Sequence, residues 1–375
     1  MHAAATLYNT PYGDFNLVRY PARSRETLQA WCAADSLLLQ EIHRLEVPAK
    51  ELLLVNDAHG ALCVALRPRA LWTDSALAVL ALRQNESSNQ QGTTRVIWST
   101  ATPSPGATLA AVRIPKNLPY FEYQLRQLAK HLPAGATVLA AGMDKHLSPH
   151  TAAILERFIG PTQRQRGSQK ARLFSAVKEP RPAIPEGDSG TYYCAALDAN
   201  LYSFPNVFSR DTVDIGTRFL LAQLHKLAPV KTMIDLACGN GVLGLSAYQQ
   251  KIARKLTFCD ESAMAIASAQ HNVTQLFPGQ LDDFGFHQGD GLLDYQGEPA
   301  ELILCNPPFH LEHTVDDFAG RRLLQQCTAS LSAGGALCLV ANRHLDYLPL
   351  LQREFHTVEK LAGNAKFNIF LARKA

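Results

Sequence analysis

Residues 232–245 read TMIDLACGNGVLGL, which predicts a short strand, a glycine turn and the start of a helix. Glycine allows positive φ and close backbone approach. Gly239, Gly241 and Gly244 have the G-x-G-x-x-G spacing of nucleotide-binding loops. Asp235 lies at the end of the predicted strand, four residues before Gly239. The stretch therefore predicts an α/β domain that binds a nucleotide-like cofactor.

Acidic residues follow the next two predicted strands. Asp260 ends the run of residues 255–259, and an acid at the end of a second strand can accept both ribose hydroxyls, which suits NAD or S-adenosyl-L-methionine. Asp290 lies where a third strand should end, within reach of an adenine amine. Each single Asp has a plain alternative as a helix N-cap. Their order along the chain favours a cofactor site.

Residues 301–310 read ELILCNPPFH. The apolar run 302–305 predicts a buried strand, which must end at Asn306 because Pro307 and Pro308 cannot donate ladder hydrogen bonds. The Asn306 side-chain oxygen and the Pro307 carbonyl then offer two acceptors for a planar amine, and Phe309 offers a ring face. A proline-rich turn is the plain alternative. Hydride transfer needs no such set, so NAD is disfavoured, and the tetrad resembles the catalytic motif of S-adenosyl-L-methionine-dependent amino-methyltransferases.

Length and composition set the class of protein. The 375 residues suffice for two domains, and 47% hydrophobic with 18% charged residues is ordinary for a globular protein. No apolar stretch is long enough to span a membrane, and the N-terminus lacks the features of a signal peptide. The eight cysteines show no CxxC pair, which predicts reduced thiols and a cytoplasmic protein. His310 and His313 have no HExxH spacing, so no metal is expected, and a net charge of +3 permits a nucleic-acid partner.

Short matches in the same order indicate an internal duplication. Residues 75–80 match residues 262–267, and Asn85 matches Asn272 at the same offset of 187. Residues 52–62 parallel residues 232–243. We predict two copies of one α/β unit, at residues 1–180 and 190–375.

The copies differ where chemistry would occur. With Gly60 aligned on Gly241, three cofactor positions carry other residues in the N-terminal copy: Leu54 for Asp235, Ala58 for Gly239 and Thr73 for Asp260. The Asn306–Phe309 tetrad aligns with residues 114–117. We therefore expect a degenerate N-terminal domain that cannot bind the cofactor productively and serves as a scaffold or in RNA recognition.

Residues 157–172 contain five basic residues and no acid. Cations on flexible loops suit phosphate contacts, which makes Arg164, Arg166 and Lys170 candidates for RNA binding. The alternative is a solvated interdomain linker. Farther on, the apolar spacing from Phe219 predicts a helix that begins near Gly216 and Thr217.

The full set of motifs resembles the bacterial ribosomal RNA guanine-N2 methyltransferases. The set includes residues 206–209 (NVFS), 214–219 (DIGTRF), 306–310 (NPPFH) and 341–347 (ANRHLDY), and the resemblance covers nearly the whole chain. Ala237-Cys238 departs from the Gly-Cys common in the family, a change between small residues. The resemblance implies two tandem Rossmann-like class I methyltransferase domains. It also implies methyl transfer from S-adenosyl-L-methionine to the exocyclic N2 of one guanine in 23S rRNA, with the 16S enzymes as a sister group.

The resemblance also implies a set of site residues. The catalytic residues would be Asn306, Pro307 and Phe309, and Phe208, Ser209 and Pro308 would contact the substrate. The cofactor-binding residues would be Asp214, Gly216, Thr217, Asp235, Gly239, Asn240, Gly241, Asp260, Asp290 and Asn306. Ribosomal RNA would be the partner, with no membrane, metal or obligatory protein partner.

Two other interpretations remain open at this point. An enzyme of the same fold could methylate adenine N6 or a protein glutamine amide, because the tetrad suits both groups. A protein with a vestigial methyltransferase fold could instead act as a non-enzymatic RNA-binding assembly factor.

Overall fold

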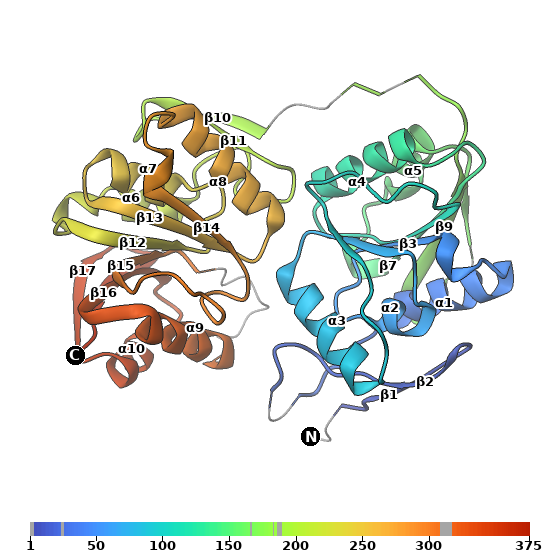
Figure 1. The fold of residues 1–375 in the computed structure, drawn as a ribbon, viewed down its shortest axis with the longest axis horizontal. Coiled ribbons are helices and arrows are strands. Elements are labelled where there is room, and N and C mark those ends of the chain that lie inside the picture. The colour runs from blue at the N-terminus through green and yellow to red at the C-terminus, as the bar shows by residue number, and fades with distance from the viewer. Residues whose placement is uncertain (1–3, 24–25, 166, 183, 186–189, 308–316) are drawn as a thin grey trace. The chain divides into compact units, whose positions relative to one another are not determined.

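The chain folds as two α/β units (Figure 1). The computed structural model describes residues 4–23, 26–165, 167–182, 184–185, 190–307 and 317–375, and of residues 317–319 the backbone only. The units are Met1–Gly187 and Asp188–Ala375, each with its own seven-stranded sheet. The predicted duplicated α/β fold is confirmed by these two sheets.

The sheet of the C-terminal unit has the strand order β14-β13-β12-β15-β16-β18-β17. Strands β12 to β16 are parallel, and β18 is antiparallel to both β16 and β17. From β12 the chain first adds β13 and β14 on one side and then returns to add β15 and β16 on the other side. Open α/β sheets bind ligands at such a switch point, at the carboxyl ends of the strands. The strands are β12 (Val230–Leu236), β13 (Ala253–Asp260), β14 (Phe284–Gln288), β15 (Ala300–Cys305), β16 (Leu331–Asn342), β17 (Thr357–Gly363) and β18 (Phe367–Arg373).

Apolar side chains of this sheet alternate between two hydrophobic cores, as the period of a strand requires. Met233 and Leu302 belong to the core beneath α6, α7 and α8, whereas Ile234 and Ile303 belong to the core beneath α9 and α10 (Figure 1). The helices are α6 (Ile215–Leu221), α7 (Val242–Gln249), α8 (Ala263–Leu276), α9 (Asp317–Ser330) and α10 (Leu348–Glu354), and a hairpin of β10 (Gly190–Cys194) and β11 (Ala199–Ser203) precedes them.

The N-terminal unit repeats this topology, with the strand order β5-β4-β3-β6-β7-β9-β8. Its strands are β3 (Leu52–Val55), β4 (Ala70–Thr73), β5 (Val96–Trp98), β6 (Leu109–Arg113), β7 (Thr137–Met143), β8 (Thr162–Arg164) and β9 (Ala171–Val177), preceded by the hairpin β1 (Leu7–Thr10) and β2 (Gly13–Asn16). Its helices are α1 (Ala33–Leu45), α2 (Ala61–Leu66), α3 (Ala76–Ser88), α4 (Leu118–His131) and α5 (Thr151–Phe158).

The sheet registers fix which residues of the two units are equivalent. Val55 pairs with Trp72 and Val112, as Leu236 pairs with Cys259 and Cys305. This register places Leu54 at the position of Asp235 and Thr73 at that of Asp260, in agreement with the sequence alignment. It places Arg113 at the position of Asn306, so the predicted equivalence of the tetrad with residues 114–117 is wrong by one residue. The loops before these strands differ in length, and only the hydrogen-bonded ladder fixes the alignment across them.

A buried asparagine makes the same three hydrogen bonds in both units. The side chain of Asn272 accepts from Tyr202 N (2.8 Å) and donates to Tyr202 O (2.9 Å) and Asn240 O (3.0 Å). The side chain of Asn85 accepts from Val18 N (2.9 Å) and donates to Val18 O (2.9 Å) and His59 O (2.7 Å). Each amide therefore ties the chain at the end of a hairpin (Tyr202 in β11, and Val18 just after β2) to the loop between the first parallel strand and its helix.

The basic segment 157–172 lies within the N-terminal sheet. Its described residues include the end of α5, strand β8 and the start of β9, and β8 pairs with β9. The alternative of an interdomain linker is wrong, because the segment belongs to the N-terminal unit. Lys170 lies in a turn just before β9. Arg172 forms an ion pair with Asp144, while Arg164 and Lys170 are exposed. Arg166 lies outside the described residues.

The shared asparagine contact gives a prediction about local stability. Replacing Asn272 by Ala leaves a backbone N–H and two carbonyl groups without their partner, and a buried unsatisfied group costs about 1–3 kcal/mol. In N272A, peptides containing Tyr202 should exchange amide hydrogen faster, as measured by mass spectrometry. In N85A, the matched control, the faster exchange should instead occur around Val18. Equal protection of both segments in both variants would contradict the role of these amides.

Candidate active site

Asn306 follows directly after β15, at the carboxyl edge of the C-terminal sheet. Its Nδ2 donates to Asp214 Oδ2 (3.1 Å) and to Thr217 Oγ1 (2.8 Å). A carboxylate can only accept, so the NH₂ group must face Asp214. Both N–H groups are thereby engaged, and the amide oxygen Oδ1 is left to accept from a ligand.

Asp214 is also the N-cap of α6. Its Oδ2 accepts from Thr217 N (3.1 Å), which satisfies one of the unpaired donors in the first turn of the helix. Asp214 and Thr217 were predicted from the resemblance to bind the cofactor. The contacts within the chain give them a different task, because both hold the amide of Asn306 in one orientation.

Gly216 is required by space in this arrangement. A Cβ atom there would lie 3.1 Å from Asp214 Oδ2, 3.3 Å from Phe367 Cε1 and 3.6 Å from Asn306 Oδ1. The absence of a side chain thus lets α6 approach the end of β15 closely. The ring of Phe367, at the start of β18, and the Asn306 amide oxygen thus both face Gly216. Phe367 was not singled out from the sequence, since a single aromatic residue in a strand gives no signal.

The glycine loop between β12 and α7 has two left-handed glycines with different surroundings. Gly241 (φ 85°) is packed so tightly that a Cβ would lie 2.9 Å from Phe258 Cε1. Gly239 (φ 55°) is less crowded, since among the described residues its Cβ would meet only Val207 Cγ1, at 3.8 Å. The described part of the chain therefore leaves room for a ligand against the loop at Gly239.

Asp260 braces the same loop from the end of β13. Its Oδ2 accepts from Gly239 N (3.0 Å) and its Oδ1 accepts from Ser262 N (3.0 Å), and the side chain remains half-buried. Asn240 is buried, and its Nδ2 donates to Tyr192 Oη (3.0 Å) and Ser203 Oγ (3.1 Å). Its amide therefore faces the hairpin rather than the space over the loop.

Asp235 is fully buried beneath the loop. Its Oδ2 accepts from Gly244 N (2.8 Å), and within the described residues its Oδ1 has no hydrogen-bond partner. Burial, and to a smaller extent the charge of Asp260, raises the pKa of Asp235 to about 8, against the opposing effect of the Gly244 contact. The side chain is thus held protonated near neutral pH.

Asp290, the predicted adenine contact, is nearly buried and forms an ion pair with Arg322 of α9. The Nη1 of Arg322 donates to Asp290 Oδ1 at 2.5 Å. This partner was missed from the sequence because the two residues are 32 positions apart and share no motif. A ligand amine would have to share the carboxylate with the guanidinium.

The remaining candidates for substrate contact are only partly described. Phe208 is exposed and Ser209 has a left-handed backbone (φ 52°), and both follow Val207, whose methyl group lies near Gly239. Pro307 is buried. Pro308, Phe309, His310 and His313 lie outside the described residues. Arg164 and Lys170 belong to the N-terminal unit.

The N-terminal unit fills the equivalent place with charge. Arg113 stands where Asn306 stands, and its Nε pairs with Asp35 Oδ1 (2.7 Å) in the first turn of α1, a helix that packs on β7 and β9 as α6 packs on β16 and β18. Asp57 Oδ2 accepts from Cys63 N (2.8 Å), the backbone group equivalent to Gly244 N. The Arg113–Asp35 ion pair thus replaces the hydrogen bonds of the Asn306 amide. The Asp57 carboxylate, from a different position in the loop, accepts the hydrogen bond that Asp235 accepts in the C-terminal unit.

Within the described residues no group of three or more His, Cys, Asp and Glu side chains is arranged to hold a metal ion. No helix among them is long and apolar enough to cross a membrane.

Comparison with known families and relatives accounts for both units. Residues 5–180 match the family model of the RLMG N-terminal domain, and residues 198–371 match that of the Methyltransferase small domain. The chain is 39% identical to the ribosomal RNA large subunit methyltransferase G of Ectopseudomonas mendocina (strain ymp), over 98% of this chain and 100% of that protein. Its identity to the protein of the same name from Pseudomonas aeruginosa (strain UCBPP-PA14) is also 39%, with the same coverage.

A solved structure has the same fold over nearly the whole chain. It is the T. thermophilus 16S rRNA N2 methyltransferase (RsmC) in complex with AdoMet and guanosine, which aligns with a TM-score of 0.74 and 21% identity. The alignment covers 99% of this chain and 98% of that one. The tandem arrangement of the two α/β units is therefore shared with a methyltransferase of known structure.

The raised pKa of Asp235 gives a prediction about stability and pH. Because its folded pKa of about 8 exceeds the unfolded value of 3.8, the folded state holds this proton more tightly, and this contribution to stability is lost as pH rises between those values. In D235N the amide oxygen can still accept from Gly244 N without titrating. Chemical denaturation at pH 5 and pH 8 should therefore show a steeper loss of stability for the wild type than for D235N. Parallel profiles would contradict the assignment.

Proposed function

The chain belongs to the ribosomal RNA large subunit methyltransferase G family, and from this premise we propose the reaction and its substrate. The C-terminal unit transfers the methyl group of S-adenosyl-L-methionine to the exocyclic N2 of a specific guanine in 23S rRNA. The products are N2-methylguanosine and S-adenosylhomocysteine. The observation that supports this most is the clamped amide of Asn306, whose oxygen is aimed away from its partners and can accept from an amino group.

The residues around the glycine loop fit the proposed cofactor. The space that the described residues leave over Gly239 admits a ligand against the backbone, and the half-buried carboxylate of Asp260, at the end of β13, has the acceptor chemistry that ribose hydroxyls need. Asp290 lies beyond the end of β14, at the same edge of the sheet. When bound, S-adenosyl-L-methionine supplies an electrophilic methyl group.

The chain itself positions the amine. The N2 lone pair of guanine is delocalised into the ring, so the amine is a poor nucleophile. The Asn306 oxygen and the Pro307 carbonyl each accept one N–H, which fixes the nitrogen and stabilises the positive charge that develops on it. The surplus proton then passes to water, and no general base is needed before the attack. The base must leave its stack to reach this site, which is cheapest in single-stranded or loosely folded RNA.

In this proposal the N-terminal domain, residues 1–180, serves RNA recognition. The catalytic domain is residues 190–375. Arg164, Arg166 and Lys170 contact phosphates in this proposal, and Phe208, Ser209, Pro308 and Phe309 contact the base. The free cysteines and the ribosomal substrate support a cytoplasmic location.

The product of the purified protein tests the reaction. Unmodified 23S and 16S rRNA would each be incubated with S-adenosyl-L-methionine and digested to nucleosides for mass spectrometry. N2-methylguanosine in the 23S sample alone is expected. Methylated adenine, or the modified guanine in 16S rRNA alone, would contradict the proposal.

The Asn306 clamp gives a prediction about turnover. N306A removes an oriented acceptor, which typically lowers kcat by ~10²–10³-fold. T217V keeps the shape of the side chain but removes one hydrogen bond to the Asn306 amide. Because a neutral hydrogen bond contributes about 0.5–1.5 kcal/mol, kcat should fall by roughly 2- to 12-fold. Calorimetry should show near-normal cofactor affinity for both variants, and full turnover by N306A would remove the catalytic assignment.

The filled N-terminal site gives a prediction about stoichiometry. Leu54, Thr73 and the Arg113–Asp35 ion pair stand where the C-terminal unit has cofactor and amide positions. Titration calorimetry of the whole chain should therefore give one molecule of S-adenosyl-L-methionine per chain, abolished by D260A combined with G239V. A second site that survives in this double variant would show that the N-terminal unit binds the cofactor.

A further inference from the structure

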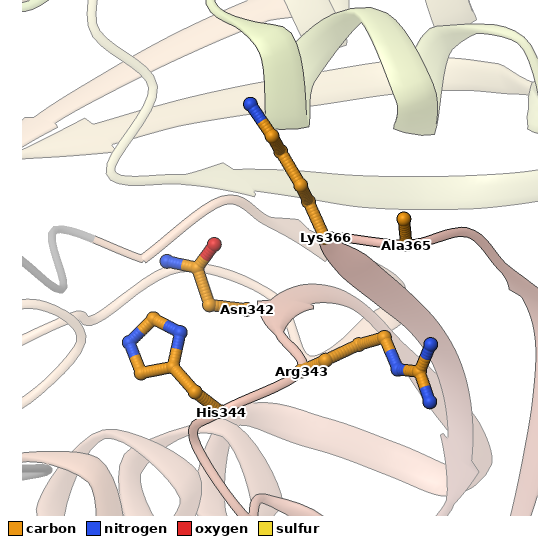
Figure 2. Close-up of a pocket in the computed structure, with 5 residues that line it drawn as sticks. All are labelled: Asn342, Arg343, His344, Ala365 and Lys366. Atoms are coloured by element: carbon orange, nitrogen blue, oxygen red, sulfur yellow. The ribbon is translucent and has the colours of Figure 1, made fainter.

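The C-terminal unit has a pocket outside the residues assigned so far. Its volume is about 560 Å³, and it is lined by Asn342, Arg343, His344, Ala365 and Lys366 (Figure 2). The lining comes from the end of β16 and the turn before β18, which are joined by a hydrogen bond from Arg343 N to Lys366 O (2.8 Å). In Figure 2, Asn342 and His344 extend to one side of the chain, Arg343 extends to the other, and Lys366 rises from the facing segment.

The charges of this pocket suit an anion. Arg343 and Lys366 are exposed, and no residue of the lining is acidic. In the part of the chain that the structure describes, neither cation forms an ion pair, and the guanidinium of Arg343 donates only to the carbonyl of Asn364 (3.3 Å). Arg322, by contrast, faces the carboxylate of Asp290. The lining thus offers a phosphate two cations that form no ion pair among the described residues, and the amide of Asn342 as a further donor.

The sheet register places this pocket near Asn306. Cys305 of β15 pairs with Leu339 of β16, so Asn306 is level with Val340, and Asn342 lies two residues farther along the neighbouring strand. Two residues span about 7 Å, and parallel strands lie about 5 Å apart. From the other side, the residue after Lys366 is Phe367, whose ring faces Gly216, as the Asn306 amide oxygen does.

The equivalent turn of the N-terminal unit keeps one of these two cations, because Lys170 has the place of Lys366. There the hydrogen bond from Asp144 N to Lys170 O corresponds to that from Arg343 N to Lys366 O. Asp144 thus occupies the position of Arg343, and its carboxylate forms an ion pair with Arg172. The N-terminal turn therefore has an acid where the C-terminal turn has Arg343, and only the C-terminal turn presents both cations.

We propose that this pocket binds a backbone phosphate of the substrate RNA next to the target nucleotide. The inference rests on the proposed function, since it takes the amine held by Asn306 to belong to a nucleotide of an RNA strand. A phosphate bound in this pocket would hold the RNA strand in place while the target base leaves its stack. Such a contact positions the RNA but does not read its sequence. The carboxylate of S-adenosyl-L-methionine is the other anion that could reach the pocket, and the experiment separates the two.

The test uses the full-length protein with R343Q and K366Q combined. The matched control combines K231Q and K255Q, which removes the same charge at the opposite end of the parallel strands, near the starts of β12 and β13. Unmodified 23S rRNA transcribed in vitro is the probe. Filter binding at several salt concentrations gives the salt dependence, steady-state assays give KM and kcat, and calorimetry gives the affinity for S-adenosyl-L-methionine.

The pocket variant should bind RNA more weakly, with a log–log salt slope flattened by about 0.7 for each lost contact to a single strand, or roughly 1.4 for both. KM for RNA should rise several-fold, while kcat at saturating RNA and cofactor affinity stay unchanged. The control should keep the wild-type slope. An unchanged slope, an equal change in the control, or a loss confined to cofactor affinity would each overturn the proposal. Wild-type protein that binds 23S rRNA without methylating it would refute the proposed function instead, and the comparison of slopes would still decide the role of the pocket.

Discussion

The hydrogen bonds that hold the Asn306 amide are the contacts on which the proposed active site of the C-terminal unit depends. An amide presents two chemically different ends, and only a partner that cannot donate decides which end faces the ligand. Asp214 supplies that partner while it caps α6, and Gly216 lets the helix approach the strand closely enough for the contact. The end of β15, the N-cap of α6 and the glycine at position 216 together set the orientation of the Asn306 amide.

The two units share one fold but differ in the side chain at the end of the strand after which Asn306 lies. Where the C-terminal unit has a neutral amide held by an acid, the N-terminal unit has the ion pair of Arg113 and Asp35. A guanidinium has no acceptor to offer an amine, so the substitution removes the chemistry but keeps a contact between strand and helix. Asp57 similarly satisfies the backbone group that Asp235 satisfies in the other unit. At both positions the two units make equivalent contacts with different side chains.

Much of this arrangement could be predicted from the sequence, and the failures have physical causes. The glycine loop, Asp260 and Asn306 carry local signals, because turns and strand ends depend on a few neighbouring residues. The partners of Asn306 and Asp290 carry none, since they lie 92 and 32 residues away in the chain. The tetrad alignment failed by one residue for a related reason. Strand register is set by hydrogen bonds between segments that sequence comparison treats as independent.

The asparagine shared by both units has a consequence for affinity. Asn272 joins the backbone at Tyr202 to that at Asn240, and so fixes the glycine loop against the hairpin through bonds made within the protein. A loop that is ordered on folding loses its conformational entropy then, and not when the ligand arrives. Because contacts within the protein already order the loop, cofactor binding need not pay a large conformational entropy cost there. Asn85 makes the same bonds in the N-terminal unit, so the order of the equivalent loop there is likewise set by contacts within the chain.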